Sequence, residues 1–222
     1  LAPLFSLHFM VLKEILILLR KELMLEWKQK YAINGLLLYV LCMVVAISLA
    51  FLNKLNPLTW NIIFRIIMLF VAINAVAKSF MSERSGHMLY LYSVVRPISI
   101  ILAKTIYNLG LLGLVSIVAL FSFAFLNQIQ LANVGAMVGI PILGSAALSS
   151  NLTLVSAIAS KAANRGTLLA VLSFPLLVPV LLVLISLSRY AIEGFEGLLT
   201  QDRFLLVGGM AAVLTVVSVI LF

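Results

Sequence analysis

The sequence is poor in charged residues, cysteine and histidine. Only 10% of its 222 residues are charged and 64% are hydrophobic, whereas a soluble domain has about 25% charged residues. A soluble globule needs more polar surface than this, and a disordered chain would contain fewer apolar residues. The single cysteine, Cys42, excludes an internal disulfide and any cysteine-based metal or haem-attachment motif. These shortages predict an integral membrane protein.

The motifs of several enzyme classes are also missing. The sequence contains no G-x-x-x-x-G-K-[ST] loop, no H-E-x-x-H and only two histidines, His8 and His87. Glu83 and His87 lie four residues apart and could share a helix face, but polar loop residues outside a shielded site are usually solvated rather than catalytic. We therefore expect no catalytic residues, no directly bound cofactor and no metal site in this chain.

Six apolar stretches are long enough to cross a bilayer, which takes about 20 helical residues. They are residues 33–52, 58–80, 101–125, 134–160, 167–187 and 204–222. A further helix is predicted over residues 7–30, where large apolar residues recur on one face at helical spacing: Leu12, Leu16, Leu19, Leu23 and Trp27. Its uncharged runs are too short to span, so residues 10–30 are predicted to form an interfacial amphipathic helix. The predicted fold is an all-α membrane bundle of six transmembrane helices preceded by this helix.

The net charge is +8, and the positions of the basic residues indicate the membrane topology. Basic residues gather on the cytoplasmic side of membrane proteins. Eleven of the 15 lysines and arginines fall on segments that share one side: Lys13, Arg20, Lys21, Lys28, Lys30, Lys78, Arg84, Arg96, Lys104, Lys161 and Arg165. Three fall on the other side: Lys54, Arg189 and Arg203. Both termini are therefore predicted to be cytoplasmic, and the positive charge does not indicate a nucleic-acid partner.

Two polar residues fall inside the second predicted span. Arg65 lies about seven residues into it, roughly 10 Å at 1.5 Å per residue. A charge within a span is a functional candidate by default, but at this depth an arginine can also snorkel to the outer interface. Asn74 lies deeper and is expected to hydrogen-bond across helices.

Small residues and prolines mark the fourth and fifth spans. Gly135 and Gly139 form a G-x-x-x-G pattern, and small residues recur over 144–150. Such a face lets helices approach closely, either within the bundle or in a dimer interface. Three prolines remove backbone donors and are predicted to bend these spans: Pro141, Pro175 and Pro179.

The inner loop at residues 81–97 combines polar residues with a short amphipathic stretch, residues 87–94. A docking element for a cytosolic partner needs this combination. A helix lying on lipid, with its tyrosines at the interface, would look the same. Composition leaves both interpretations open.

Several segments, taken in order, resemble the haem exporter protein B family of cytochrome c maturation. They are KELMLEWK at 21–28, RPISIILAK at 96–104, KAANRG at 161–166 and LSFPLLVP at 172–179. The resemblance implies a permease of ABC-2-like architecture in the bacterial inner membrane. It also implies a separate cytosolic ATPase subunit, other membrane subunits of the maturation system and a homodimer as one arrangement.

The same resemblance assigns roles to the inner loops. The ATPase is expected to dock on the 81–97 loop and on the basic turn near 161–166, through Glu83, Arg84, Gly86, His87, Tyr90, Lys161 and Arg165. Haem would be handled by the complex and ATP bound by the partner, which leaves this chain without a cofactor of its own. Because chains of the family typically begin close to Met10, residues 1–9 are expected to be an upstream or disordered extension, and residues 10–222 a single permease domain.

Two alternatives share the same sequence features. One is an ABC-2-type exporter of another substrate, such as a lipid or a drug. The other is a non-transporting membrane scaffold, which would not need ATP turnover in its partner.

Overall fold

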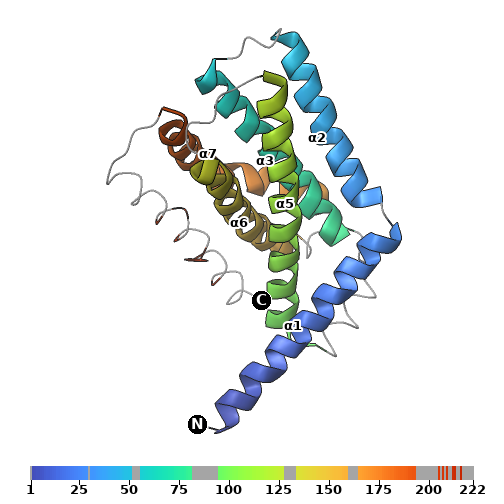
Figure 1. The fold of residues 1–222 in the computed structure, drawn as a ribbon. Helices are drawn as coiled ribbons and strands as arrows, with labels where there is room; N and C mark the ends of the chain where they lie inside the picture. Colours follow the sequence, from blue (N-terminus) through green and yellow to red (C-terminus); the bar gives the residue numbers. More distant parts are fainter. Residues whose placement is uncertain are drawn as a thin grey trace.

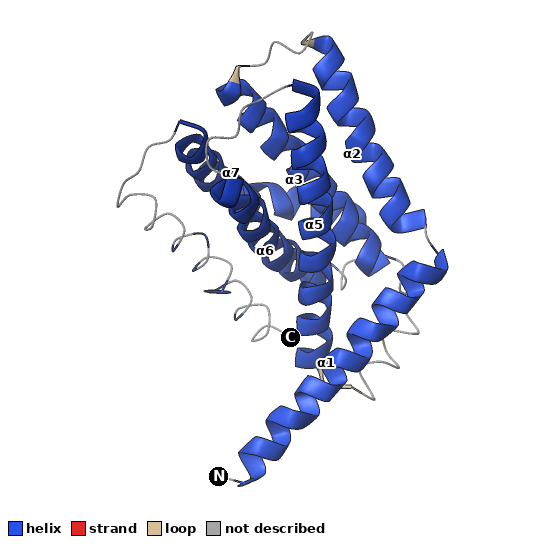
Figure 2. Ribbon diagram, viewed as in Figure 1, coloured by secondary structure: helices blue, strands red, loops and turns tan. Residues whose placement is uncertain are grey.

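The computed structural model describes the backbone of residues 2–29, 31–51, 56–81, 95–127, 134–159 and 165–193, with isolated residues between 205 and 216. Within these ranges the elements are all α-helices (Figure 2). They are α1 (Ala2–Gln29), α2 (Tyr31–Ala50), α3 (Pro57–Met81), α5 (Pro97–Asn127), α6 (Val134–Ala159) and α7 (Arg165–Glu193). The predicted all-α fold class is confirmed.

Five of the described helices are long and apolar enough to cross a membrane, namely α2, α3, α5, α6 and α7. They follow the first five predicted spans, and α5 and α7 each extend several residues further. The sixth predicted span, 204–222, lies largely outside the described residues, although those that are described there are helical. The prediction of an integral membrane protein is therefore confirmed.

Helix α3 occupies the middle of the bundle, in contact with α2, α5, α6 and α7. The buried core gathers around it, and aromatic rings join it to α5. The ring of Trp60 stacks on Phe64 at a centroid distance of 5.7 Å and on Phe123 of α5 at 5.6 Å. At the same end of α5, Asn127 donates to the Ser48 hydroxyl of α2 at 2.9 Å. Aromatic stacking and interhelical hydrogen bonds thus fix α3 and α2 against α5.

Helix α1 lies across the N-terminal end of α5 rather than in the bundle (Figure 1). It begins at Ala2, so the backbone of residues 2–9 is helical. The expectation that residues 1–9 are an extension outside the permease domain stays a prediction. Two residues of the predicted leucine stripe do not face the protein, because Leu16 is 63% exposed and Leu23 is 58% exposed, whereas Leu19 of the same stripe packs against the core. Ile15 and Leu18 are buried against α5 instead. Leu16 and Leu23 are therefore available to lipid, as an interfacial helix requires.

Of the α6 glycines, Gly144 rather than Gly139 lies close to a neighbouring helix. A Cβ atom at Gly144 would lie 3.1 Å from Leu184 of α7. Gly135 is exposed, and a Cβ atom at Gly139 would meet nothing within 4 Å. The small residues over 144–150 therefore pack within the bundle, whereas neither Gly135 nor Gly139 is seen in close contact with the described helices.

The three predicted helix-bending prolines all lie inside continuous helices. Pro141 is buried within α6, whereas Pro175 and Pro179 are exposed on α7. Each removes one backbone donor from its helix. The bending role assigned to them stays a prediction.

The two α6 glycines provide a matched pair for testing this packing. Alanine favours a helix over glycine by about 1 kcal/mol, so Gly139→Ala is expected to keep or raise the Tm of the purified protein. Gly144→Ala should lose that benefit, because its Cβ atom would force Leu184 to move. Thermal unfolding in detergent measures both, and a Gly144→Ala variant as stable as Gly139→Ala would show that α6 and α7 are not in close contact there.

Candidate functional site

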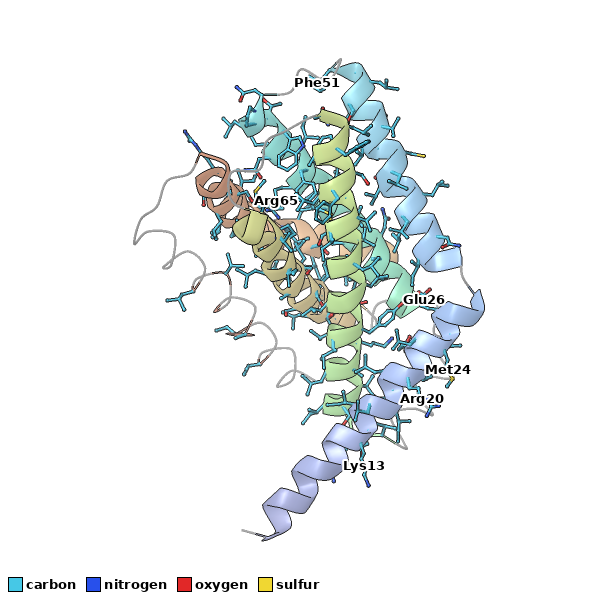
Figure 3. All side chains as sticks on the ribbon, viewed as in Figure 1. Lys13, Arg20, Met24, Glu26, Phe51 and Arg65 are labelled. Carbon is cyan, nitrogen blue, oxygen red and sulfur yellow. The ribbon has the colours of Figure 1, made fainter. Side chains whose placement is uncertain are left out.

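Arg65 lies inside the bundle rather than at its surface. Only 5% of its surface is exposed, and Figure 3 places it among the packed helices. Its Nη2 atom donates to the hydroxyl of Ser188 on α7. Its guanidinium carbon lies 5.2 Å from the centroid of the Phe64 ring. The side chain therefore does not snorkel to the outer interface in the described bundle, and a functional role for its charge stays a prediction.

Neighbouring residues complete what we call the Arg65 centre, formed by Asn61, Arg65, Gly144 and Ser188. Asn61 lies one turn before Arg65 on α3 and donates to the backbone carbonyl of Ile185 on α7 at 2.9 Å. On α6, a Cβ atom at Gly144 would lie 3.5 Å from Nη1 of Arg65. The guanidinium therefore sits where α3, α6 and α7 meet, and the absence of a side chain at Gly144 leaves it room.

The Arg65 centre retains unused hydrogen-bonding capacity. The Nε atom of Arg65 and the Oδ1 atom of Asn61 are buried without a hydrogen-bond partner. Buried polar groups in proteins are nearly always paired. The centre therefore offers a donor and an acceptor to a further group.

Asn74 lies on the outward side of α3, in contrast to Arg65. Its side chain is exposed, so the expected hydrogen bond across helices is not made by the described residues. The two residues are nine positions apart on a helix with 3.6 residues per turn. That spacing places them half a turn apart, so they cannot both face the interior.

A line of hydroxyl and amide groups joins α5 to α6 through the interior. Ser149 donates to the backbone carbonyl of Thr105 at 2.7 Å, and Asn108 donates to the Thr153 hydroxyl at 3.4 Å. All four residues are buried. Small hydroxyl residues on α6 therefore serve interhelical bonding, which is how small polar residues hold membrane helices together.

A second polar cluster, which we call the inner seam, joins α1 to the first three turns of α5. The carboxylate of Glu14 accepts from Ser99 at 2.5 Å, and that of Glu26 accepts from the Tyr107 hydroxyl at 2.7 Å. Between these contacts, Glu22 lies 4.0 Å from the ammonium group of Lys104. Lys104 and Tyr107 are buried in this contact, so the seam is part of the packed structure rather than a solvated surface.

The inner seam was not predicted, although its pattern is present in the sequence. Glu14, Glu22 and Glu26 are separated by eight and four residues, and Leu18 fills the gap. This i, i+4 spacing puts all four on one helix face.

The predicted coupling residues fall mostly outside the described ranges. Those outside are Glu83, Arg84, Gly86, His87, Tyr90 and Lys161, and Arg165 is described only as the first residue of α7. Their roles stay predictions. Among the residues described, no group of histidine, cysteine, aspartate and glutamate side chains could hold a metal ion.

The inner seam can be tested by a double-mutant cycle on Glu26 and Tyr107. A hydrogen bond to a charged group contributes about 1.5–3 kcal/mol, so Tyr107→Phe should lower the Tm by several degrees. The double variant, with Tyr107→Phe and Glu26→Ala together, should lose much less stability than the sum of the losses in the two single variants. Tyr39→Phe is the control, since Tyr39 is a half-buried tyrosine of α2 outside the seam. Strict additivity would show that the two side chains do not interact.

Comparison with known proteins identifies the family. The chain matches the sequence model described as CcmB protein over residues 13–221. No curated protein matches the chain. The match covers almost the whole chain and confirms the resemblance to the haem exporter protein B family. The chain belongs to the CcmB protein family, and is accordingly a membrane permease component of a haem-export system for cytochrome c maturation rather than an enzyme.

Proposed function

We propose that this chain couples ATP hydrolysis by a separate cytosolic ATPase subunit to haem handling for c-type cytochrome assembly. Family membership supports the haem-export context. The structural observation that carries the coupling is the inner seam, which fixes α1 to the end of α5 that follows the 81–97 loop. In this proposal the ATPase binds ATP, the complex handles haem, and this chain holds no cofactor.

The length of α5 suits it to receive a force from the cytosol. Its 31 residues, at about 1.5 Å each, give a helix roughly 46 Å long. The hydrocarbon core of a bilayer is about 30 Å thick. A helix of this length has several turns to spare, and its first three turns are those held by α1 (Figure 1).

A force that the docked ATPase exerts on the 81–97 loop would move α5 and α1 together. Helix α5 begins at Pro97, directly after the loop. Besides the polar contacts, Ile15 and Leu18 of α1 pack against Ile100 and Ala103 of α5. These joined contacts support a mechanical role, in which docking of the ATPase moves the inner ends of the spans.

The proposed location is the bacterial inner membrane, with both termini in the cytoplasm. The distribution of lysine and arginine supports this orientation, because eleven fall on the side of the proposed docking loops and three on the other. The complex would contain the ATPase, other membrane subunits of the maturation system and one or two copies of this chain.

A charge reversal in the inner loop tests ATPase docking. The tagged chain is co-expressed with a candidate ATPase subunit from the same genome, and the amount of ATPase retained on purification is measured. We expect Arg84→Glu to reduce retention about tenfold, since it reverses a charge in the proposed docking loop. Arg203→Glu, the same change on the predicted outer side, should leave retention unchanged.

Function is read separately, as c-type cytochrome content. Inactivating the ATPase's own nucleotide-binding lysine should abolish c-type cytochromes while leaving the complex assembled. If c-type cytochromes persist with the inactive ATPase, the chain is a scaffold. If the wild-type chain retains no ATPase at all, the coupling proposal is wrong.

A further inference from the structure

The charges of α1 are divided between two of its faces. The structure describes the α1 side chains of residues 13–26, and the three carboxylates in this range all belong to the inner seam, where they contact α5. Lys13 and Arg20 are instead exposed, and Figure 3 shows both on the side of α1 away from α5. Among residues 13–26, that side therefore carries positive charge and no carboxylate.

Basic and apolar side chains alternate along this exposed side. Lys13, Ile17, Arg20 and Met24 are separated by four, three and four residues, which places them on one helix face. We call these four residues the outer face of α1. Ile17 is 68% exposed and Met24 is 49% exposed. A helix that combines basic and large apolar residues in this way is suited to the boundary between water and lipid.

The connection to α2 brings the outer face to the membrane surface. Helix α1 ends at Gln29, and α2, which is long and apolar enough to span the membrane, begins at Tyr31. Along α2, Leu38 and Leu49 are 66% and 68% exposed, as expected of side chains that face lipid. Because one residue separates the two helices, α1 lies where α2 enters the bilayer. The predicted topology makes this the cytoplasmic leaflet.

The charge of the outer face determines which lipid head groups it attracts. Each lysine or arginine close to an anionic membrane surface strengthens binding about fivefold. The guanidinium of Arg20 also presents a fork of donors that fits a phosphate. A zwitterionic head group carries the same phosphate, but its ammonium group cancels the charge. Because the α1 carboxylates are turned toward α5, they do not repel an anionic head group from the outer face.

An acidic segment of a partner protein would match the two basic residues but not the apolar surface around them. Leu16 and Leu23 lie beside the outer face and are 63% and 58% exposed, which adds to the apolar area that lipid can cover.

We propose that the outer face of α1 binds the head groups of anionic phospholipids, with Lys13 and Arg20 at the phosphates and Ile17 and Met24 at the acyl boundary. This interaction lies beyond the proposed coupling function and does not depend on it.

The experiment compares the lipids beside α1 with the lipids beside α2. The full chain carries a fluorophore either on Met24→Cys in a Cys42→Ser background, or on the native Cys42, which is exposed on α2. Each form is placed in nanodiscs of equal parts phosphatidylglycerol and phosphatidylcholine, with quenching bromine atoms on the acyl chains of one lipid or the other. The ratio of quenching by the anionic lipid to quenching by the neutral lipid measures the selectivity.

We expect a ratio of about five at position 24 and about one at Cys42. Added salt should bring the ratio at position 24 toward one, because exposed charges are screened. A ratio of about one at both labels, or an equal enrichment of phosphatidylglycerol at both, overturns the proposal. The first of these results is also the one expected if the outer face docks a protein partner.

Matched variants assign the selectivity to the two basic residues. Arg20→Gln should lower the ratio at position 24, and Lys13→Gln together with Arg20→Gln should reduce it to about one. Arg189→Gln, at an exposed arginine of α7 on the predicted outer side, should preserve it. An unchanged ratio in the double variant contradicts the proposal.

Folding and coupling are separated from lipid binding by independent readouts. Lys13 and Arg20 are exposed, so their substitution should leave the Tm nearly unchanged, and Tm is measured for every variant. If a variant fails to fold, the salt dependence of the starting protein still decides, since an enrichment that salt does not reduce is not electrostatic and refutes the proposal. Loss of ATPase retention would refute the coupling function without affecting these ratios, and a ratio of about one would leave ATPase retention unaffected.

Discussion

The hydrocarbon interior of a membrane offers no hydrogen bonds, so each polar group in the bundle needs a partner within the protein, on its own helix or on another. This constraint fixes how the described helices meet. Ser149 binds the backbone of α5, Asn127 binds Ser48 of α2, and Asn61 binds the backbone of α7. Apolar side chains pack equally well against lipid and protein. The polar contacts therefore determine which faces of the helices turn inward.

The same constraint explains what could be predicted from the sequence. Hydropathy located five described spans, because the length and apolarity of a span depend on the membrane and not on its neighbours. It did not identify which face of α1 meets the protein. Leu16 and Leu23 look like core residues, yet they are exposed, because lipid accepts leucine as readily as a protein core does. The glutamates of α1 were the informative residues, since a carboxylate at this position needs a protein partner.

Depth along a span was predictable, but direction around the helix was not. Arg65 and Asn74 were both identified as polar residues within one span, and only Arg65 faces the interior. The direction of Arg65 depends on Ser188 and Gly144, which lie 123 and 79 residues further along the chain. No local pattern brings such distant residues together. The family resemblance predicted the fold and the haem-export context, but it did not include this centre.

The inner seam and the Arg65 centre are connected through α5 and α6. Thr105 of α5 lies between Lys104 and Tyr107, which contact α1, and its carbonyl accepts from Ser149 of α6. Five residues before Ser149, Gly144 lies against Leu184 and the guanidinium of Arg65. Packed interiors have little free volume to absorb a shift. A displacement of the inner end of α5 must therefore either break these interhelical hydrogen bonds or move α6 against Arg65. In the second case a movement that starts on the cytosolic side of α5 reaches the buried guanidinium.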